Sequence, residues 1–489
     1  MKINTEKTLL SIIIRLKEVN TWGSLLVFLI TLAFSGCKKF IEVDAPNTST
    51  TTDLVYSTDS KAIGAMTGIY AKMSSNSFYV NGFLSLSLSP ELSGDNLGLF
   101  DGSNPNYTSY YKNELNPQYN GSPSNLWSSL YSVIYDSNAV LEGVTRSTHL
   151  SSNVKNQLLA EAYFVRAFCY FYLTNLYGDV PLALTTDYTI TAILSRNAQR
   201  DIYNQIISDL KAAKALISEQ YLDSKLSGTS IERVRPNRFA VSALLARVYL
   251  FSDNFTDAEM EASEVIGNLT DYSLEGLNQV FQKNSREILW SIQPVAIGEN
   301  TKEALFYYLP ATGPSSSNPA FLSPLLMGSF EPNDQRKGVW TSTVTVSGLS
   351  YSFPTKYREI GYNAPVSEYS VPLRLAEQYL IRAEARAMQN KIAEAKEDVN
   401  SIRARAGLGE SAASTKESLL TAILQERRVE FFTEWGTRWF DLKRTGQINA
   451  QMQIAASFKG ITWKPSAQLY PLPQFDITRN KNLSQNPGY

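Results

Sequence analysis

The sequence predicts a mainly α-helical protein built from helical hairpins, with an irregular, loop-rich region that contains a few short strands. Three observations lead to this fold class. Apolar residues recur at helical spacing over most of the chain, one helix–turn–helix pattern occurs twice, and the stretch between its two copies has no helical period. The 489 residues are enough for two or three lobes or for one large domain.

Residues 1–36 have the pattern of a lipoprotein signal peptide. Basic residues precede an apolar run (22–34), which is followed by the small residues Ser35 and Gly36 and then by Cys37. An uncleaved membrane anchor is the alternative, but the run is shorter than the roughly 20 residues that span a bilayer. We therefore expect a lipid on Cys37 and a polar tether over residues 37–59.

The composition excludes several classes of function. Lys and Arg number 45 and Asp and Glu 46, so the net charge of −1 gives no electrostatic reason to expect a nucleic-acid partner. His149 is the single histidine and lies in a Ser/Thr-rich segment that we expect to be an exposed loop, which argues against a multi-histidine metal site. Cys169 lies in an apolar helical run and is expected to be buried. We predict no metal and no cofactor.

The first part of the chain, 60–270, is predicted to be helical apart from one long loop. Gly178 and Pro181 are typical of the end of its third helix. Residues 74–123 have no sustained period, and their aromatic residues argue against disorder, so we expect a functional loop there. The helical segments are 60–73, 126–141, 158–176, 201–217 and 236–250.

One helix–turn–helix pattern occurs twice. Residues 246–258 and 383–395 align at an offset of 137 residues (383 − 246), with small residues on the first helix, a polar turn and then an apolar residue, Phe255 or Ile392. This is the rhythm of a tetratricopeptide-like hairpin, in which alanines let two antiparallel helices approach closely. Two ordinary helical hairpins that resemble each other by chance are the alternative.

Residues 271–370 between these copies form the irregular region. The runs EILWSIQP and TSTVTVSG are typical of short strands, and Pro- and Ser-rich segments surround them. Pro372 is interpreted as the start of the next helix, which opens a helical C-terminal region over 371–489. The final residues, NPGY, are expected to dock on the rest of the protein.

A dense block of opposite charges follows Glu426. Its sequence is ERRVEFFTEWGTRWFDLKR, with the charges at helical spacing. Paired carboxylates there could serve acid–base catalysis, as in glycoside hydrolases. We favour a structural ion-pair network instead, because neutralising arginines crowd these carboxylates.

Several of these motifs together resemble a known family. The segments RAFCYFYLTNLYGDVPL and RPNRFAVSALLARVYLF, the charged block and the lipoprotein pattern at Cys37 occur in the family's order. The sequence resembles the SusD/RagB family of outer-membrane nutrient-binding lipoproteins over essentially the whole mature chain. The resemblance implies four tetratricopeptide-like units that support an irregular ligand-binding region.

The resemblance also implies a function and partners. Members of the family bind glycans without catalysis and cover a TonB-dependent, SusC-like transporter in the outer membrane, where they are lipid-anchored and face the outside. Ligand residues differ between members, so only the location of the site carries over: loops early in the chain and the region between the helical pairs.

Candidate ligand residues come from the chemistry of sugars. Aromatic rings cover the apolar faces of a sugar, and amide or carboxylate groups bond its hydroxyls. For each candidate, ordinary packing is the alternative. Asp101, Ser103 and Asn106 could also supply oxygens to calcium, but their spacing does not match an EF-hand loop. The candidates are Asn96, Asp101, Tyr107, Tyr110, Tyr111, Tyr308, Trp340, Tyr357 and Tyr362.

Three functional hypotheses follow. The first is a lipid-anchored, non-catalytic protein that binds oligosaccharides or polysaccharide and delivers them to a transporter. The second is a tetratricopeptide-type scaffold for peptides or proteins, which needs an open helical groove. The third is a glycoside hydrolase, which needs two facing carboxylates in an aromatic cleft.

Overall fold

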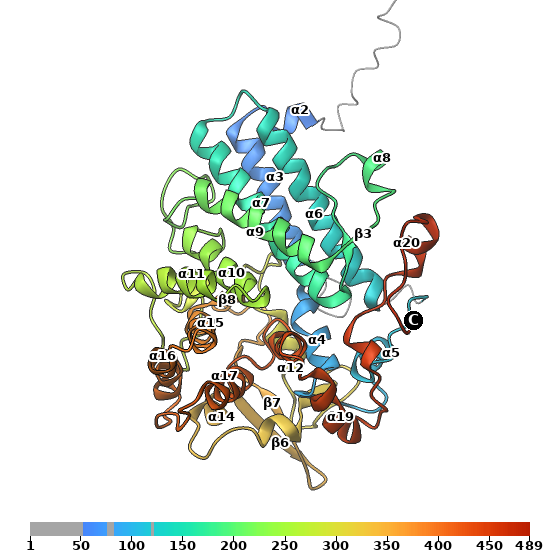
Figure 1. Ribbon diagram of the computed structural model, residues 1–489, viewed down its shortest axis with the longest axis vertical. Coiled ribbons are helices and arrows are strands. Elements are labelled where there is room, and N and C mark those ends of the chain that lie inside the picture. The colour runs from blue at the N-terminus through green and yellow to red at the C-terminus, as the bar shows by residue number, and fades with distance from the viewer. Residues whose placement is uncertain (1–51, 76–82, 119–121) are drawn as a thin grey trace, which may run out of the picture. The chain divides into compact units, whose positions relative to one another are not determined.

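The computed structural model describes residues 52–75, 83–118 and 122–489, and helices dominate it (Figure 1). This confirms the predicted mainly α-helical fold class. Residues 55–489 group into one compact unit. The signal peptide and Cys37 lie outside the described residues, as does most of the tether. No described helix is both long and apolar enough to cross a membrane.

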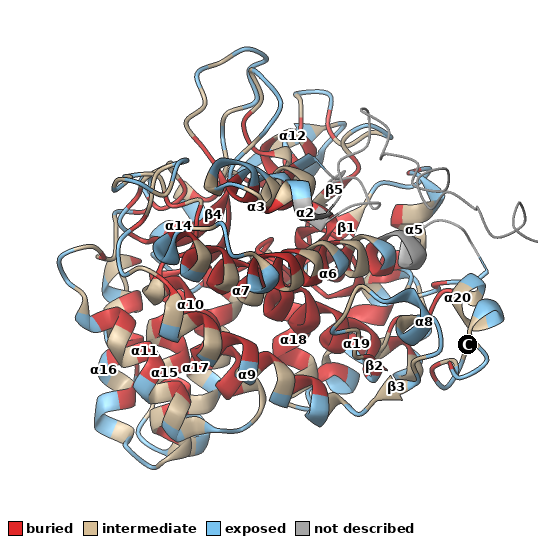
Figure 2. Ribbon diagram, turned by 90° about the horizontal axis from the view of Figure 1, so that it is seen from above, coloured by how far each residue is buried: buried red, intermediate tan, exposed pale blue. Residues whose placement is uncertain are grey.

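The N-terminal helices pack around one buried helix. Helix α7 (Ser152–Tyr177) lies between α6 (Ser122–Arg146) and α9 (Gln199–Leu216), and α3 (Asp59–Ser75) packs against α6 and α7. Figure 2 shows α7 buried along most of its length. It ends at Gly178, whose φ of 76° is a left-handed conformation that glycine adopts readily. The thiol of Cys169 on α7 is buried, as predicted, and burial raises its pKa.

The two predicted hairpins are confirmed. Helix α10 (Arg238–Phe251) turns into α11 (Phe255–Gly267), and α15 (Leu375–Met388) turns into α16 (Ile392–Arg405). Asp253 and Asn390, which correspond at the offset of 137, both have positive φ, 57° and 62°. The fully buried Ala258 and Ala395 also correspond, and α11 packs on α15. Small residues thus allow close helix contact in both hairpins.

The helix predicted to begin at Pro372 begins later, so that prediction was wrong. Pro372 lies in strand β8 (Ser370–Arg374), which pairs antiparallel with β4 (Ile288–Ile292), and the helix starts at Leu375. Both strands are wholly buried. Proline is tolerated because the sheet has only two strands, so each strand has a free edge. The run EILWSIQP contains β4, as predicted.

The predicted loop 74–123 contains short elements in its described part. These are the 3-10 helix η2 (Phe83–Ser87), α4 (Ser89–Ser93), β1 (Leu97–Leu99) and α5 (Pro105–Tyr111). The irregular region likewise holds α12 (Lys302–Tyr307), β5 (Ala320–Leu322), α13 (Pro324–Met327), α14 (Gln335–Val339), β6 (Thr341–Val346) and β7 (Leu349–Pro354). The division into 60–270, 271–370 and 371–489 stays a prediction.

The C-terminal part wraps back onto the early helices. Asn486 Nδ2 donates to the carbonyl oxygens of Tyr177 (2.9 Å) and Tyr470 (2.7 Å), and the Tyr489 hydroxyl donates to Leu469 O (2.9 Å). The tail is therefore docked, as predicted. The remaining elements are α2 (Thr52–Val55), β2 (Val180–Pro181), α8 (Tyr188–Thr191), β3 (Arg196–Asn197), α17 (Lys416–Glu430), α18 (Thr437–Arg444), α19 (Ile448–Lys459), η3 (Pro465–Gln468) and α20 (Gln474–Arg479).

Candidate functional site

A four-stranded sheet brings together two segments that are far apart in the sequence. Strand β1 pairs antiparallel with β5, β5 with β7, and β7 with β6. Directly after β1, the backbone N–H of Phe100 donates to Pro319 O at 2.8 Å. The early loop and the irregular region, both predicted to lie near the ligand, therefore meet at one sheet.

Close packing across this sheet depends on Gly98. A Cβ atom at Gly98 would lie 2.2 Å from the ring of Phe321, which faces it across the strand pair. The same ring contacts Tyr351 edge to face, with 5.2 Å between ring centroids. Gly98 therefore lets an aromatic ring lie against the β1 backbone and holds the adjacent loops in place.

The loops that leave this sheet present a surface of half-exposed aromatic and polar side chains, which we call the loop face. Phe100 is 38% exposed and Tyr308 is 40% exposed. The ring of Tyr308 packs edge to face on Phe353 (5.8 Å), so its orientation is fixed. Asp101, a candidate ligand residue, is exposed on the turn after Phe100. The loop face consists of Phe100, Asp101, Asn104, Tyr308 and residues 314–318.

Helix α5 buries the three tyrosines that were candidates for ligand contact. Tyr107 packs on Phe306 (5.4 Å between centroids), and Tyr110, which is fully buried, packs on Tyr470 (5.3 Å). Tyr111 is also buried. These rings attach α5 to the protein and leave little surface for a ligand.

Asn96 and Trp340 are fully buried, contrary to what a ligand contact requires. Asn96 Nδ2 donates to Glu91 Oε2 at 3.3 Å. The Trp340 indole N–H donates to Leu277 O at 2.9 Å, and the Lys356 ammonium lies 4.9 Å from its ring centroid. Both residues lie among charged groups: Arg428 Nε also donates to Asn96 Oδ1 at 3.3 Å, and the guanidinium groups of Arg374 and Arg405 lie 5.9 Å and 5.6 Å from the Trp340 ring centroid.

Tyr357 and Tyr362 lie close in sequence but in different environments. The Tyr357 hydroxyl accepts the backbone N–H of Val371 (2.9 Å), and burial raises its pKa well above the ordinary value. Tyr362 is 81% exposed on a loop attached to the β4–α12 loop, where Asn363 N donates to Gly298 O at 3.0 Å. Tyr357 is partly buried, so Tyr362 is the more accessible ring of this pair.

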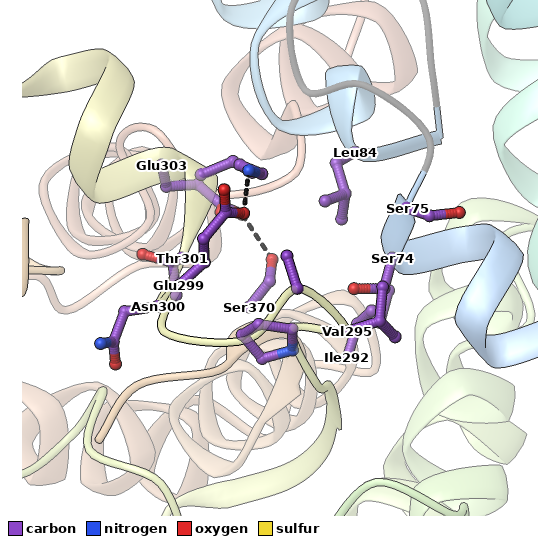
Figure 3. A pocket seen from close by; sticks show the side chains of 13 residues that line it. Ser74, Ser75, Leu84, Ile292, Val295, Glu299, Asn300, Thr301, Glu303 and Ser370 are labelled. Carbon is purple, nitrogen blue, oxygen red and sulfur yellow. Dashed lines mark hydrogen bonds and ion pairs between the residues drawn. The ribbon is translucent and has the colours of Figure 1, made fainter. Parts of the chain in front are cut away.

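A pocket of about 230 Å³ lies at the β4–α12 loop (Figure 3). In Figure 3, Leu84 lies on the side of the pocket opposite Thr301 and Glu303. Ser370 donates to the Glu303 carboxylate, and Lys302 pairs with Glu299. The pocket is lined by Ser74, Ser75, Leu84, Ile292, Pro294, Val295, Ala296, Glu299, Asn300, Thr301, Lys302, Glu303 and Ser370.

Glu303 is the buried acid of this pocket. Burial raises its pKa to about 6, although hydrogen bonds from Ser370 and Ser87 oppose the shift. Sequence reasoning did not identify Glu303, Ser370 or Leu84. They come from separate elements with no shared spacing, so no local pattern could have found them.

The charged block forms a buried ion-pair network. Glu430 accepts from Arg336 (2.9 Å), Arg374 (2.7 Å) and Arg405. Burial alone would raise its pKa, but the arginines lower it well below the ordinary value. Arg438 ties the block to Asp95 at 2.8 Å, just before β1. These carboxylates are buried and neutralised, as the structural interpretation predicted.

No metal centre is found in the part of the chain that the structure describes. There, no group of three or more His, Cys, Asp or Glu side chains is arranged to hold an ion.

Comparisons with known proteins agree with this architecture. Residues 331–489 match the family model described as "SusD family", and residues 39–250 match the model "Starch-binding associating with outer membrane". The chain belongs to the SusD/RagB family. A SusD-like protein P2 from Formosa agariphila is 27% identical over 87% of this chain and 92% of its own length. The starch-binding protein SusD of Bacteroides thetaiotaomicron is 32% identical over 32% of this chain and 29% of its own length.

Solved SusD-like structures share the fold. A SusD superfamily protein from Bacteroides vulgatus superposes with a TM-score of 0.77 at 18% identity, covering 88% of this chain and 99% of its own. A laminarin-binding SusD-like protein gives 0.70 at 22% identity, covering 89% and 100%. Surface glycan-binding protein A from Bacteroides uniformis gives 0.74 at 20% identity, covering 88% and 99%.

Proposed function

We propose that this SusD/RagB protein is a non-catalytic lipoprotein of the outer membrane that binds oligosaccharides or polysaccharide and delivers them to a TonB-dependent, SusC-like transporter. The observation that carries the proposal is the loop face. It combines the partly exposed rings of Phe100 and Tyr308, of which Tyr308 packs on Phe353, with polar side chains from a second loop, and this combination suits the alternating apolar and hydroxyl surface of a sugar chain. Of the predicted ligand residues, Asp101 and Tyr308 belong to this face, and Tyr362 is exposed on a separate loop.

The carboxylates favour binding over catalysis. Within the loop face, all of whose residues the structure describes, Asp101 is the one acidic residue, whereas glycoside hydrolases use two carboxyl groups across the bond. In the pocket, Glu299 is paired with Lys302 and Glu303 is buried against Ser370. The names of similar proteins, which include laminarin-binding and starch-binding proteins, point to the same class of ligand.

A panel of plant, algal, fungal and host polysaccharides, including laminarin and starch, tests the proposal. The purified full-length protein in detergent should retain its ligand in affinity electrophoresis and bind it in calorimetry without releasing product. Binding to no glycan would overturn the proposal, and turnover of a bound glycan would overturn its non-catalytic part. Tight binding of peptides instead would favour a tetratricopeptide-type scaffold.

Substitutions at the loop face locate the site. Phe100→Ala and Tyr308→Ala should each weaken binding of the identified glycan about tenfold, since one aromatic contact contributes about 1 kcal/mol beyond its burial. Met260→Ala on α11, which removes an exposed apolar side chain elsewhere, is the control. Unchanged affinity in both loop-face variants would move the site away from this surface.

Lipid attachment and partnership are tested separately. A Cys37→Ala protein should fold and bind glycan in solution but fail to support uptake, because it is no longer held at the membrane. Retention of this variant in the outer membrane would refute the lipid anchor. Purification of the wild-type protein from membranes should also recover the transporter.

A further inference from the structure

A second cavity, of about 410 Å³, lies between α6, the loop 181–194 and α20, and we call it the α6–α20 groove. Figures 1 and 2 both place α8, which belongs to this loop, on the same side of the protein as α20. The groove shares no lining residue with the loop face or with the pocket at Glu303. Its lining consists of Trp127, Tyr131, Ile134, Tyr135, Asn138, Pro181, Ala183, Thr185, Thr191, Ala192, Leu194, Asp476, Arg479, Asn480 and Leu483.

The floor of the groove is aromatic and rigid. Trp127, Tyr131 and Tyr135 follow one another at intervals of four residues, so they lie along one side of α6. The rings of Trp127 and Tyr131 pack with centroids 4.8 Å apart, and the Tyr131 hydroxyl donates to Pro181 O at 2.7 Å. Tyr135 is 55% exposed and leaves a ring face open to a ligand.

The opposite wall is attached at both ends, so the groove exists without a ligand. Asn138 Nδ2 donates to Ala183 O at 3.0 Å, and Asn480 Nδ2 donates to Leu194 O at 2.7 Å. These bonds hold the loop 183–194 between α6 and α20. Because the cavity is preformed, little free energy is lost in ordering protein segments when a ligand binds.

Two charged side chains of α20 supply polar contacts at the mouth of the groove. Asp476 accepts the indole N–H of Trp127, and its pKa is raised by burial despite that bond. The Arg479 guanidinium lies 3.7 Å from the ring centroid of Phe475 and donates no side-chain hydrogen bond to any residue that the structure describes. One carboxylate acceptor and one unused, oriented set of donors therefore flank an aromatic floor.

This combination selects a class of ligand. Aromatic rings favour the C–H faces of a sugar ring, while a carboxylate and a guanidinium bond its hydroxyls. The opposite charges of Asp476 and Arg479 offset each other, which favours a neutral sugar over an acidic one. The volume lies within the roughly 300–1,000 Å³ typical of small-ligand sites.

We propose that the α6–α20 groove is a second glycan-binding site that takes neutral sugar units of the same polysaccharide as the loop face. The proposal rests on the proposed function and adds a second point of attachment. Asp476 accepts and Arg479 donates hydrogen bonds to sugar hydroxyls, while Tyr135 stacks on the ring. Two sites on one protein raise the avidity for a long chain without a stronger contact at either site.

Hydrogen–deuterium exchange of the full-length protein in detergent tests this site. Laminarin and starch are the first probes, followed by the rest of the polysaccharide panel. A bound glycan should slow exchange at 127–138, 183–194 and 474–483 as well as at 97–104. In a Tyr135→Ala/Arg479→Ala double variant, protection of the groove segments should disappear while that of 97–104 persists, and affinity for the polysaccharide should fall at least tenfold.

The controls separate the two proposals. Both substituted side chains are exposed, so an unchanged melting temperature should accompany the loss, and Tyr188→Ala, which removes an exposed tyrosine outside the lining, should have no effect on groove protection. Protection of 97–104 alone would overturn the second site and leave the proposed function intact. Protection of neither segment by any glycan would overturn both.

The loop 183–194 also carries exposed aliphatic side chains, which suggest a different type of ligand as the alternative. Ile190 is 50% exposed and Ile193 is 64% exposed, and aliphatic side chains of this kind suit an apolar protein segment more than a sugar. Protection of the groove by a protein partner, with none by glycan, would therefore overturn the proposal in favour of a protein-docking site.

Discussion

The charged network around Glu430 and the loop face differ in almost every physical respect. The network is buried, dense in charge and tied together by arginine pairs that link α17 to α14, β8 and α16. The loop face is exposed, carries one acidic residue among its described positions and presents two aromatic rings, one of which, that of Tyr308, packs on Phe353. In this protein, the dense cluster of charges therefore has a structural role. The surface available to a ligand instead carries a few partly exposed aromatic residues.

Two buried glutamates, Glu430 in the network and Glu303 in the pocket, have pKa values shifted in opposite directions. Burial acts on both, but three arginines surround Glu430 and lower its pKa well below the ordinary value. Around Glu303 the hydrogen-bond donors are the hydroxyls of Ser370 and Ser87, which are too weak to offset burial, so its pKa rises to about 6. The first carboxylate is a fixed charge and the second is poised to bind a proton.

Removal of Glu430 should have the largest effect on stability. Glu430→Ala leaves Arg336, Arg374 and Arg405 without their shared partner in a buried site, and we expect a loss of about 3–5 kcal/mol in the free energy of unfolding. Urea denaturation measures this loss. Glu397→Ala on the exposed face of α16 is the control and should cost no more than about 0.5 kcal/mol. A similar small cost for both variants would show that the network is not what holds these elements together.

The helical framework could be predicted because its signals are local. The hairpin at Asp253 and its counterpart at Asn390 show the same small residues, polar turn and apolar residue in sequence and the same backbone turn in the structure. Pro372 misled the prediction, since its strand exists only through pairing with β4, which lies about 80 residues earlier in the chain.

The site could be predicted only as a region. Tyr107, Tyr110 and Trp340 have the same composition as ligand-binding aromatics, and whether a ring faces solvent or the core depends on distant partners such as Phe306, Tyr470 and Leu277. The pocket at Glu303 and the α6–α20 groove arise from segments that meet only after folding. The pocket leaves no pattern in one stretch of sequence, and the regular spacing of Trp127, Tyr131 and Tyr135 marks one side of α6 without indicating the segments that form the rest of the groove.

The pH dependence of stability should reveal the poised carboxyl group. The pKa of Glu303 in the folded protein is raised above its ordinary value of 4.5. The contribution of this carboxyl group to the free energy of unfolding is therefore fully present below about pH 4.5 and is lost as the pH rises through about 6. Glu303→Gln stays neutral throughout. Relative to this variant, the wild type should lose about 2 kcal/mol of unfolding free energy between pH 4.5 and 7, as measured by urea denaturation at each pH.

A second substitution sharpens this test. The Ser370 hydroxyl stabilises the charged form of Glu303, so Ser370→Ala should raise the pKa further and enlarge the loss at neutral pH. If the unfolding free energies of the wild type and Glu303→Gln change with pH in parallel, the pKa of Glu303 is not raised. The difference between this pocket and the network around Glu430 would then be contradicted.

The smallest expected effects concern the turns that give both hairpins their shape. Asp253 and Asn390 hold left-handed backbone conformations at equivalent positions, where a Cβ atom is unfavourable. Glycine at either position should change the unfolding free energy by no more than about 1 kcal/mol. Alanine should destabilise by about 1 kcal/mol, because the left-handed conformation is strained for a residue with a Cβ atom and is tolerated better by Asp and Asn. Thermal unfolding of the four variants measures these changes. Since the turns share their backbone geometry, the changes in unfolding free energy of the two alanine variants should agree to within about 0.5 kcal/mol. A large loss of stability at only one position would mean that the two turns are stabilised differently despite their similar sequences.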